Sequence, residues 1–353
     1  MVRKRTTLPK DFESLLPTAP IDELLAVFDR CELDARHGHD KATALGMVDC
    51  PDELVVWFVR QGLDVDSRDL YGRTPLARRA SRGRAEQIAL LLSLGADIDA
   101  PDTSGQTPLH AAVRSHRVAT TLALLEHDAS IPGTDRNGRT LLMQGLFLTR
   151  NADIPATATI AGLLMQRGEH SSSETRAEVE RIGRDFEFHR DAFAPDRLEE
   201  TASALDTLYE LFGVTPVGRL VRHDETSPII VPEGRWQEQH GALWDALVPS
   251  SGAAPTVQGE VIRITGRLSD EILRNGRANW DRDFGSMLDA LPGYFARANP
   301  VNGELFDEAR SIAKRLRSGV DDQALLRRLT ELAVQWVGEN PAPLRLEAVG
   351  YGR

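Results

Sequence analysis

The chain repeats the stretch Asp69-Leu-Tyr-Gly72-Arg-Thr74-Pro75-Leu76 at a fixed interval. The stretch returns as Asp102-Thr-Ser-Gly105-Gln-Thr107-Pro108-Leu109, and more weakly as Asp135-Arg-Asn-Gly138-Arg-Thr140-Leu141-Leu142. The spacing is 33 residues both times. An internal period of this size is typical of a solenoid, in which each repeat is one small unit stacked on the next.

Each copy has the pattern of a turn followed by a helix. Aspartate opens the turn, and the glycine three residues later supplies backbone freedom. Threonine then caps the helix, and proline fits the first helical turn because its missing donor would be unpaired there. A second apolar helix follows, carrying Leu91-Leu92 in one copy and Leu124-Leu125 in the next, and Gly95 is placed to end the first of these. One such unit cannot bury its apolar face alone, so several must stack.

These residues resemble the ankyrin repeat, whose unit is a β-turn finger followed by two antiparallel helices. The resemblance covers about residues 36–170, with two good copies and two degenerate ones. The first copy lacks the Thr-Pro-Leu start but keeps its second helix, Asp52–Arg60. In the last copy the apolar pair Leu163-Leu164 comes late, which predicts a lengthened loop between the helices at Asn151–Ala156.

The copies also depart from the family pattern at single positions. Thr-Pro-Leu-His is complete only at Thr107–His110, since Ala77 replaces the histidine of the preceding copy. Arg79 stands where a small buried alanine is usual, and His116 and Asp128 replace glycines. We therefore expect altered packing around Arg79.

The fold class predicted is all-α: an ankyrin-repeat solenoid followed by a C-terminal helical domain. The predicted divisions are an N-terminal tail with a capping helix (1–35), about four ankyrin repeats (36–170), a degenerate helical cap (171–217), a linker (218–235), a helical domain (236–340) and a tail (341–353). An independent small domain is the alternative for 171–217. The basic N-terminus is expected to be a frayed, solvated end.

Apolar residues at helical spacing place the other helices. The capping helix is Ile21–Phe28, a capping box at Ser171–Glu174 starts a helix that runs to about His189, and Leu198–Phe212 is the next helix. The C-terminal domain has five predicted helices: Trp236–Val248, Val257–Ile272, Phe284–Leu291, Leu305–Leu316 and Gln323–Val337. This domain resembles tails attached to some bacterial ankyrin-repeat proteins, a resemblance that implies no activity.

Composition limits the functional classes. The chain has 353 residues and a net charge of −11, which disfavours nucleic acid and anionic membranes as partners. No apolar run approaches the length of a membrane-spanning helix, and no signal peptide is recognisable, so we expect a cytoplasmic protein. Cys31 and Cys50 are too few for a disulfide framework and are expected to be reduced and buried.

Catalytic and metal-binding signals are weak. No phosphate loop, HExxH or GxSxG motif occurs, so no cofactor and no metal site are predicted. His37 and His39 could hold a metal but are more simply solvated. Glu271, Asp281 and Asp283 could form an acid/base site, although a helix cap at Asp281 explains the pattern better. The segment His223–Ser227 contains the residue types of a catalytic triad: a hydroxyl nucleophile, a histidine base and an acidic residue to orient it. Neighbouring residues in a linker rarely have the geometry of a triad, which is assembled from distant segments.

In ankyrin proteins the fingertips and the exposed positions of the inner helices form a concave binding surface. The resemblance places thirteen residues of this chain there: Leu70, Tyr71, Arg73, Ser81, Arg82, Thr103, Ser104, Gln106, Arg114, Ser115, Arg136, Asn137 and Arg139. Tyrosine and arginine are typical of binding hot spots. Five of the thirteen are arginines, so this strip is basic on an acidic protein and is expected to prefer an acidic segment.

The resulting hypothesis is a non-catalytic scaffold or adaptor that binds another protein through the concave surface. Because bacterial ankyrin proteins include adaptors and immunity proteins, the resemblance suggests neutralisation of a toxin as one form of this role. The alternative is an enzyme whose active site lies in the C-terminal helical domain, with the repeats used for substrate recruitment.

Overall fold

The computed structural model describes residues 3–131, 133–135, 137–297, 303–320 and 322–352. The chain forms two compact units. Unit 1 comprises residues 1–185 and 195–217, and unit 2 comprises residues 186–194 and 218–353. Helices dominate both units, so the structure agrees with a solenoid of helix pairs followed by a helical region.

A small sheet opens unit 1. Strands β1 (Arg5–Thr7), β2 (Cys31–His37) and β3 (Ala42–Thr43) lie in that order, with β1 parallel to β2 and β3 antiparallel to it. Arg5 N donates to Arg30 O at 2.8 Å, and Leu8 N donates to Arg36 O at 3.0 Å. The expectation of a frayed N-terminal end is therefore wrong from Arg5 onward, because backbone hydrogen bonds pair β1 with β2, a segment distant in the sequence.

Two short helices and a 3-10 turn close the start of unit 1. They are α1 (Phe12–Leu15), α2 (Ile21–Ala26) and the turn Val27–Asp29, so the predicted capping helix exists with a tightened end. The rings of Phe12 and Phe28 pack edge to face with centroids 5.8 Å apart, and Phe58 packs on Phe28 at 4.8 Å. These aromatic contacts join the N-terminal segment to the first repeat.

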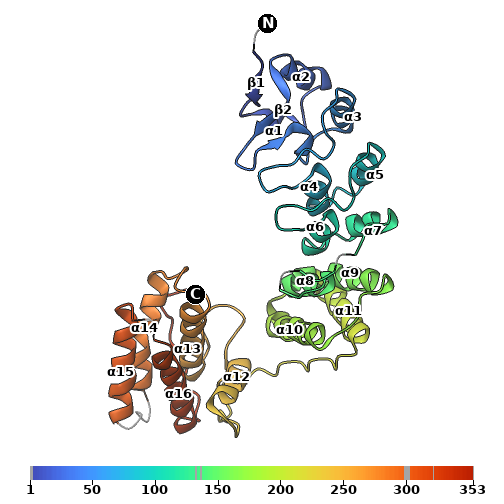
Figure 1. Cartoon of the computed structure of the whole chain (residues 1–353). Coiled ribbons are helices and arrows are strands. Elements are labelled where there is room, and N and C mark those ends of the chain that lie inside the picture. Colours follow the sequence, from blue (N-terminus) through green and yellow to red (C-terminus); the bar gives the residue numbers. More distant parts are fainter. Residues whose placement is uncertain (1–2, 132, 136, 298–302, 321, 353) are drawn as a thin grey trace. The chain divides into compact units, whose positions relative to one another are not determined.

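The repeats form two rows of helices, which Figure 1 shows side by side in unit 1. The helices of the inner row contact one another in the order α4 (Pro75–Arg82), α6 (Pro108–Arg114) and α8 (Leu141–Leu148). The outer row begins with α3 (Asp52–Arg60) and continues through α5 (Glu86–Ser93), α7 (Val118–Glu126) and α9 (Ile154–Gln166). In the first repeat a 3-10 turn at Ala44–Gly46 takes the place of an inner helix.

The predicted caps of the inner helices are confirmed. Thr74, Thr107 and Thr140 each accept a hydrogen bond from the backbone N–H three residues later. Gly95 ends α5 with a φ of 94°. His116 and Asp128, which replace glycines, also adopt positive φ, at 53° and 61°.

The predicted long loop in the last repeat is shorter than expected. A 3-10 turn at Asn151–Asp153 leads directly into α9, which begins at Ile154 with Pro155 in its first turn. Most of the inserted residues therefore lengthen the helix, since proline is compatible with a helix start.

Two longer helices, α10 (Ser173–His189) and α11 (Pro195–Phe212), follow the repeats, and α11 packs on α9. The cap of α10 lies one residue later than predicted: Ser172 Oγ accepts from Thr175 N at 3.2 Å. A short 3-10 turn at Arg190–Ala192 connects the two helices.

Unit 2 contains the five predicted helices of the C-terminal domain. They are α12 (Trp236–Leu247), α13 (Val257–Leu273), α14 (Arg282–Phe295), α15 (Gly303–Arg317) and α16 (Gln323–Glu339). Their apolar stripes share one core, with α13 in contact with α12, α14 and α16.

Parts of the predicted linker and tail belong to this core. Ile229 is 4% exposed, and its N–H donates to Pro341 O at 2.7 Å. Leu344 N donates to Gln258 Oε1 at 3.0 Å, and the hydroxyls of Tyr351 and Tyr294 are 2.8 Å apart in the interior. Single apolar residues in an irregular segment have no periodicity, so these contacts could not be predicted from the sequence.

Both cysteines are buried free thiols, as predicted. Burial raises the pKa of the Cys50 thiol to about 12. Among the described residues, no helix is long and apolar enough to cross a membrane.

Candidate protein-binding surface

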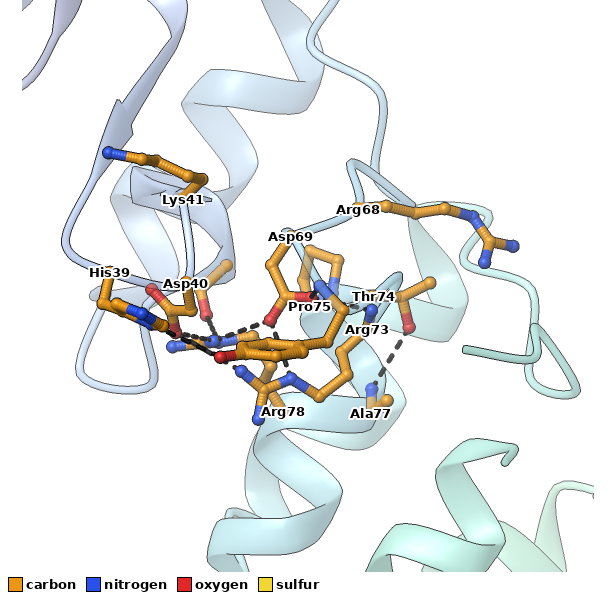
Figure 2. Close-up of polar contacts among 12 residues, drawn as sticks. His39, Asp40, Lys41, Arg68, Asp69, Arg73, Thr74, Pro75, Ala77 and Arg78 are labelled. Carbon is orange, nitrogen blue, oxygen red and sulfur yellow. Dashed lines mark hydrogen bonds and ion pairs between the residues drawn. The ribbon is translucent and has the colours of Figure 1, made fainter. Parts of the chain in front are cut away.

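The first finger is organised by a buried carboxylate, Asp69 (Figure 2). Its Oδ1 accepts hydrogen bonds from Tyr71 N and Arg73 N, both at 2.9 Å. Its Oδ2 accepts from Arg73 Nε at 2.7 Å and from Arg78 Nη1 at 2.9 Å. Asp69 therefore fixes the turn and also ties the finger to the inner helix α4.

Tyr71 at this fingertip is exposed yet held in place. Its side chain is 43% exposed, and its hydroxyl lies 3.3 Å from His39 Nδ1. The Arg73 guanidinium carbon lies 5.0 Å from the centre of its ring, a cation–π distance. A large side chain that is already ordered loses little conformational entropy when a partner binds.

Two arginines at the first finger, Arg73 and Arg78, are paired with carboxylates (Figure 2). Arg78 pairs with both Asp40 and Asp69, and Arg73 pairs with the same two residues. Burial raises the pKa of Asp40, but the hydrogen bond and charge of Arg78 outweigh this and hold that pKa below its usual range. Arg73 therefore adds no unpaired charge to the strip, contrary to the sequence-based expectation.

The second and third fingers repeat the same turn. Asp102 Oδ1 accepts from Ser104 N and Gln106 N, and Asp135 Oδ1 accepts from Asn137 N and Arg139 N. The first two fingers are also linked, because Thr103 N donates to Tyr71 O at 3.0 Å. Gly72 lies against this link: a Cβ there would come within 2.8 Å of Thr103 N, and its φ is 76°.

The predicted fingertip residues lie at the surface. Leu70, Thr103, Ser104 and Asn137 are exposed, while Gln106 and Arg139 are half-buried. Arg136 lies outside the described residues.

The inner-helix positions differ in their contacts. Arg82 is exposed at the end of α4, and Ser81 Oγ donates back to Arg78 O. Arg114 Nη1 donates to Gln144 Oε1 at 3.2 Å, and Ser115 follows the last turn of α6. We call the face formed by the three fingers (69–73, 102–106 and 135–139) and by α4, α6 and α8 the finger face.

Comparison with known families agrees with this architecture. A family model described as ankyrin repeats, in three copies, matches residues 44–135. Residues 44–135 are ankyrin repeats. Ankyrin repeats indicate a scaffold for protein–protein interaction. A comparison with curated proteins found no match.

Two side chains of the ankyrin finger face were missed from the sequence. Phe147 on α8 is 46% exposed, and the Arg139 guanidinium carbon lies 4.4 Å from its ring centre. Gln144, one turn earlier, accepts the bond from Arg114. The repeat period could have found Phe147, because it stands 33 residues after Arg114.

The carboxylates considered for an acid/base site have structural contacts in unit 2. Asp281 caps α14 by accepting from Asp283 N at 3.0 Å and Phe284 N at 3.3 Å, as the cap interpretation predicts. Asp283 Oδ2 accepts from Gly352 N at 3.0 Å. Glu271 is buried and accepts from Asn279 N at 2.6 Å, which holds the loop after α13.

The other candidate groups also have local contacts. His37 Nε2 lies 3.2 Å from Lys10 O, and His39 contacts Tyr71. Asp224 Oδ1 accepts from Thr226 N, Ser227 N and Ser227 Oγ, and these bonds hold the pKa of that carboxyl well below its usual range. Asp224 therefore stabilises a turn within residues 224–227. The described residues contain no group of three or more residues placed to bind a metal.

Proposed function

We propose that this protein is a cytoplasmic, non-catalytic scaffold that binds a protein partner through the finger face. One observation carries the proposal: Tyr71 is a large exposed side chain held by His39 and Arg73 on a finger that Asp69 fixes. Aromatic residues of this kind are enriched at binding hot spots. A rigid site avoids much of the entropy loss on association.

The second support is the distribution of exposed apolar side chains. Leu70 is 58% exposed beside Tyr71, and Phe147 is exposed on α8 of the same finger face. Side chains of this size gain free energy when a partner removes them from water. Two apolar contacts at different repeats favour a partner that extends across the finger face.

Affinity purification from the native host tests the proposal. The full chain should retain a protein partner, and the double variant Tyr71→Ala, Phe147→Ala should lose it. Leu122→Ala is the matched control, since Leu122 is a large exposed residue on the outer helix α7. If the double variant and the control retain the partner equally, the partner does not bind through Tyr71 and Phe147, and the proposal is contradicted.

Neutralisation of a toxin is the finer form of this role, and it rests on the resemblance to bacterial ankyrin proteins alone. Its test is genetic. Expression of a neighbouring gene should arrest growth, and co-expression of this protein should restore growth unless Tyr71 and Phe147 are changed. Rescue by the double variant would separate any protective effect from the finger face.

A further inference from the structure

The middle of the finger face has more hydrogen-bond donors than acceptors. Arg114 donates to Gln144 Oε1, and no carboxylate among the described residues lies within ion-pair distance of its guanidinium. Gln144 is 2% exposed, and its Nε2 has no acceptor among the described residues. Gln144 Nε2 is too buried for a partner to reach, so the donors that remain for a partner here are those of the half-buried Arg114 guanidinium.

The third finger also has hydrogen-bond donors without acceptors, on the side chain of Arg139. Its guanidinium lies over the ring of Phe147 and forms no ion pair within the described part of the chain. The neighbouring carboxylate, Asp135, accepts from the backbone N–H of Asn137 and Arg139. The donors of the Arg139 side chain therefore remain for a partner, and they lie next to an apolar ring.

The first finger, unlike the third, has arginines that form ion pairs. Its two arginines, Arg73 and Arg78, are matched by the carboxylates of Asp40 and Asp69. The described arginines of the finger face that form no ion pair are thus Arg82 at the end of α4, Arg114 on α6 and Arg139 on the third finger, and Arg139 lies over the ring of Phe147. An acidic segment with an apolar side chain is complementary to both features at once.

We propose that the finger face takes an acidic protein segment whose carboxylates bind Arg114 and Arg139 and whose apolar side chain packs on Phe147. This inference rests on the proposed function, since it names the chemistry of the partner for the same surface. Nucleic acid could supply acceptors too, but a net charge of −11 opposes a polyanion that extends beyond these two arginines. A short acidic protein segment avoids most of that repulsion.

Selection from a random dodecapeptide library against the full chain tests the proposal. The enriched peptides should carry net negative charge together with a large apolar residue. Their affinity should fall at least roughly tenfold in Arg114→Glu, Arg139→Glu, as expected for loss of charged hot-spot contacts, and should weaken as salt rises. Arg114→Gln, Arg139→Gln should also weaken binding, and it guards against misfolding caused by charge reversal.

The control is Arg60→Glu, which reverses the charge of one exposed arginine on the outer helix α3 and should leave peptide affinity unchanged. The proposal is overturned if the enriched peptides are neutral or basic, if none are enriched, or if the double variants bind them as tightly as the native chain does. Binding of a single-stranded DNA oligonucleotide with the same arginine dependence would also overturn it, in favour of nucleic acid.

The two proposals can fail separately. A host partner that is lost with Tyr71→Ala, Phe147→Ala but kept by both arginine variants would refute the acidic segment and leave the scaffold role intact. Acidic peptides that need the arginines, with no host partner on the finger face, would give the opposite result.

Discussion

Arg79 shows how one residue adapts the repeat to its neighbour. The side chain is fully buried where the family has a small residue, and burial lowers its pKa. Its Nε donates to Gln87 Oε1 at 2.8 Å, and its Nη1 donates to Leu45 O at 2.9 Å. Leu45 lies in the 3-10 turn of the first repeat. The arginine thus fills the space left where that repeat lacks an inner helix.

Truncation of this side chain should destabilise unit 1. Arg79→Ala removes the donors for Gln87 and Leu45 and leaves a cavity, so we expect a loss of about 2–4 kcal/mol in the free energy of unfolding. Arg84→Ala, which breaks an exposed pair with Asp49, should lose less than about 1 kcal/mol. Urea denaturation measures both. Similar losses for the two variants would mean that the buried contacts contribute little.

Asp128 is in a conformation that suits glycine. Its φ is 61° at the end of α7, and the residue is exposed. Asp128→Gly should therefore raise the free energy of unfolding by up to about 1 kcal/mol through relief of the left-handed strain. Thermal denaturation of the full chain measures the change, and a lower melting temperature would contradict the strain interpretation.

At the scale of elements, α6 has a buried histidine in its first turn, His110, and a half-buried histidine, His116, just after its last turn. His110 Nδ1 accepts from Thr107 N at 3.1 Å, and His116 Nε2 lies 3.3 Å from Gly145 O. Burial lowers the pKa of both imidazoles from their ordinary value of 6.5. The unfolded chain therefore binds protons that the folded chain excludes as the pH falls below this value.

The stability of unit 1 should thus decrease between about pH 7 and about pH 5, because protonation favours the unfolded state in that window. The double variant His110→Gln, His116→Asn cannot bind these protons and should show a smaller decrease. Urea denaturation at the two pH values measures the difference. An equal decrease in the double variant would assign the effect to other groups.

Elements specified by adjacent residues were predictable from the sequence, and elements formed by distant pairing were not. The fingers and inner-helix starts depend on aspartate, glycine and threonine within a few residues of one another. Strand β1 has three exposed residues and exists only because it pairs with β2. For the finger face, the repeat period located Tyr71 and Arg73, but the pairing with Asp40 was missed because it crosses into the degenerate first copy.

On the scale of the whole molecule, the two units have separate cores. Unit 2 is held by residues of all five helices and by its final segment, where Tyr351 meets Tyr294. Burial and this hydrogen bond raise the pKa of Tyr351, so its hydroxyl stays neutral in the folded state. The last residues are therefore part of the fold of unit 2.

Denaturation of the full chain should accordingly show two transitions. Tyr351→Phe removes one buried hydrogen bond and should lower the stability of unit 2 by about 1 kcal/mol. Arg79→Ala should shift only the transition of unit 1. Trp57, the one tryptophan in residues 1–217, allows unit 1 to be followed by fluorescence when the other tryptophans are replaced by phenylalanine. A single transition shifted by both variants would show that the units unfold together.

Photo-crosslinking in the native host tests the central claim most directly. A photoreactive phenylalanine analogue replaces Tyr71 in one variant and Arg60, on the outer helix α3, in another. We predict that the variant at position 71 forms a discrete covalent adduct with a protein and that the variant at position 60 does not. The absence of an adduct at position 71, or the same adduct at both positions, would contradict a partner bound at the finger face.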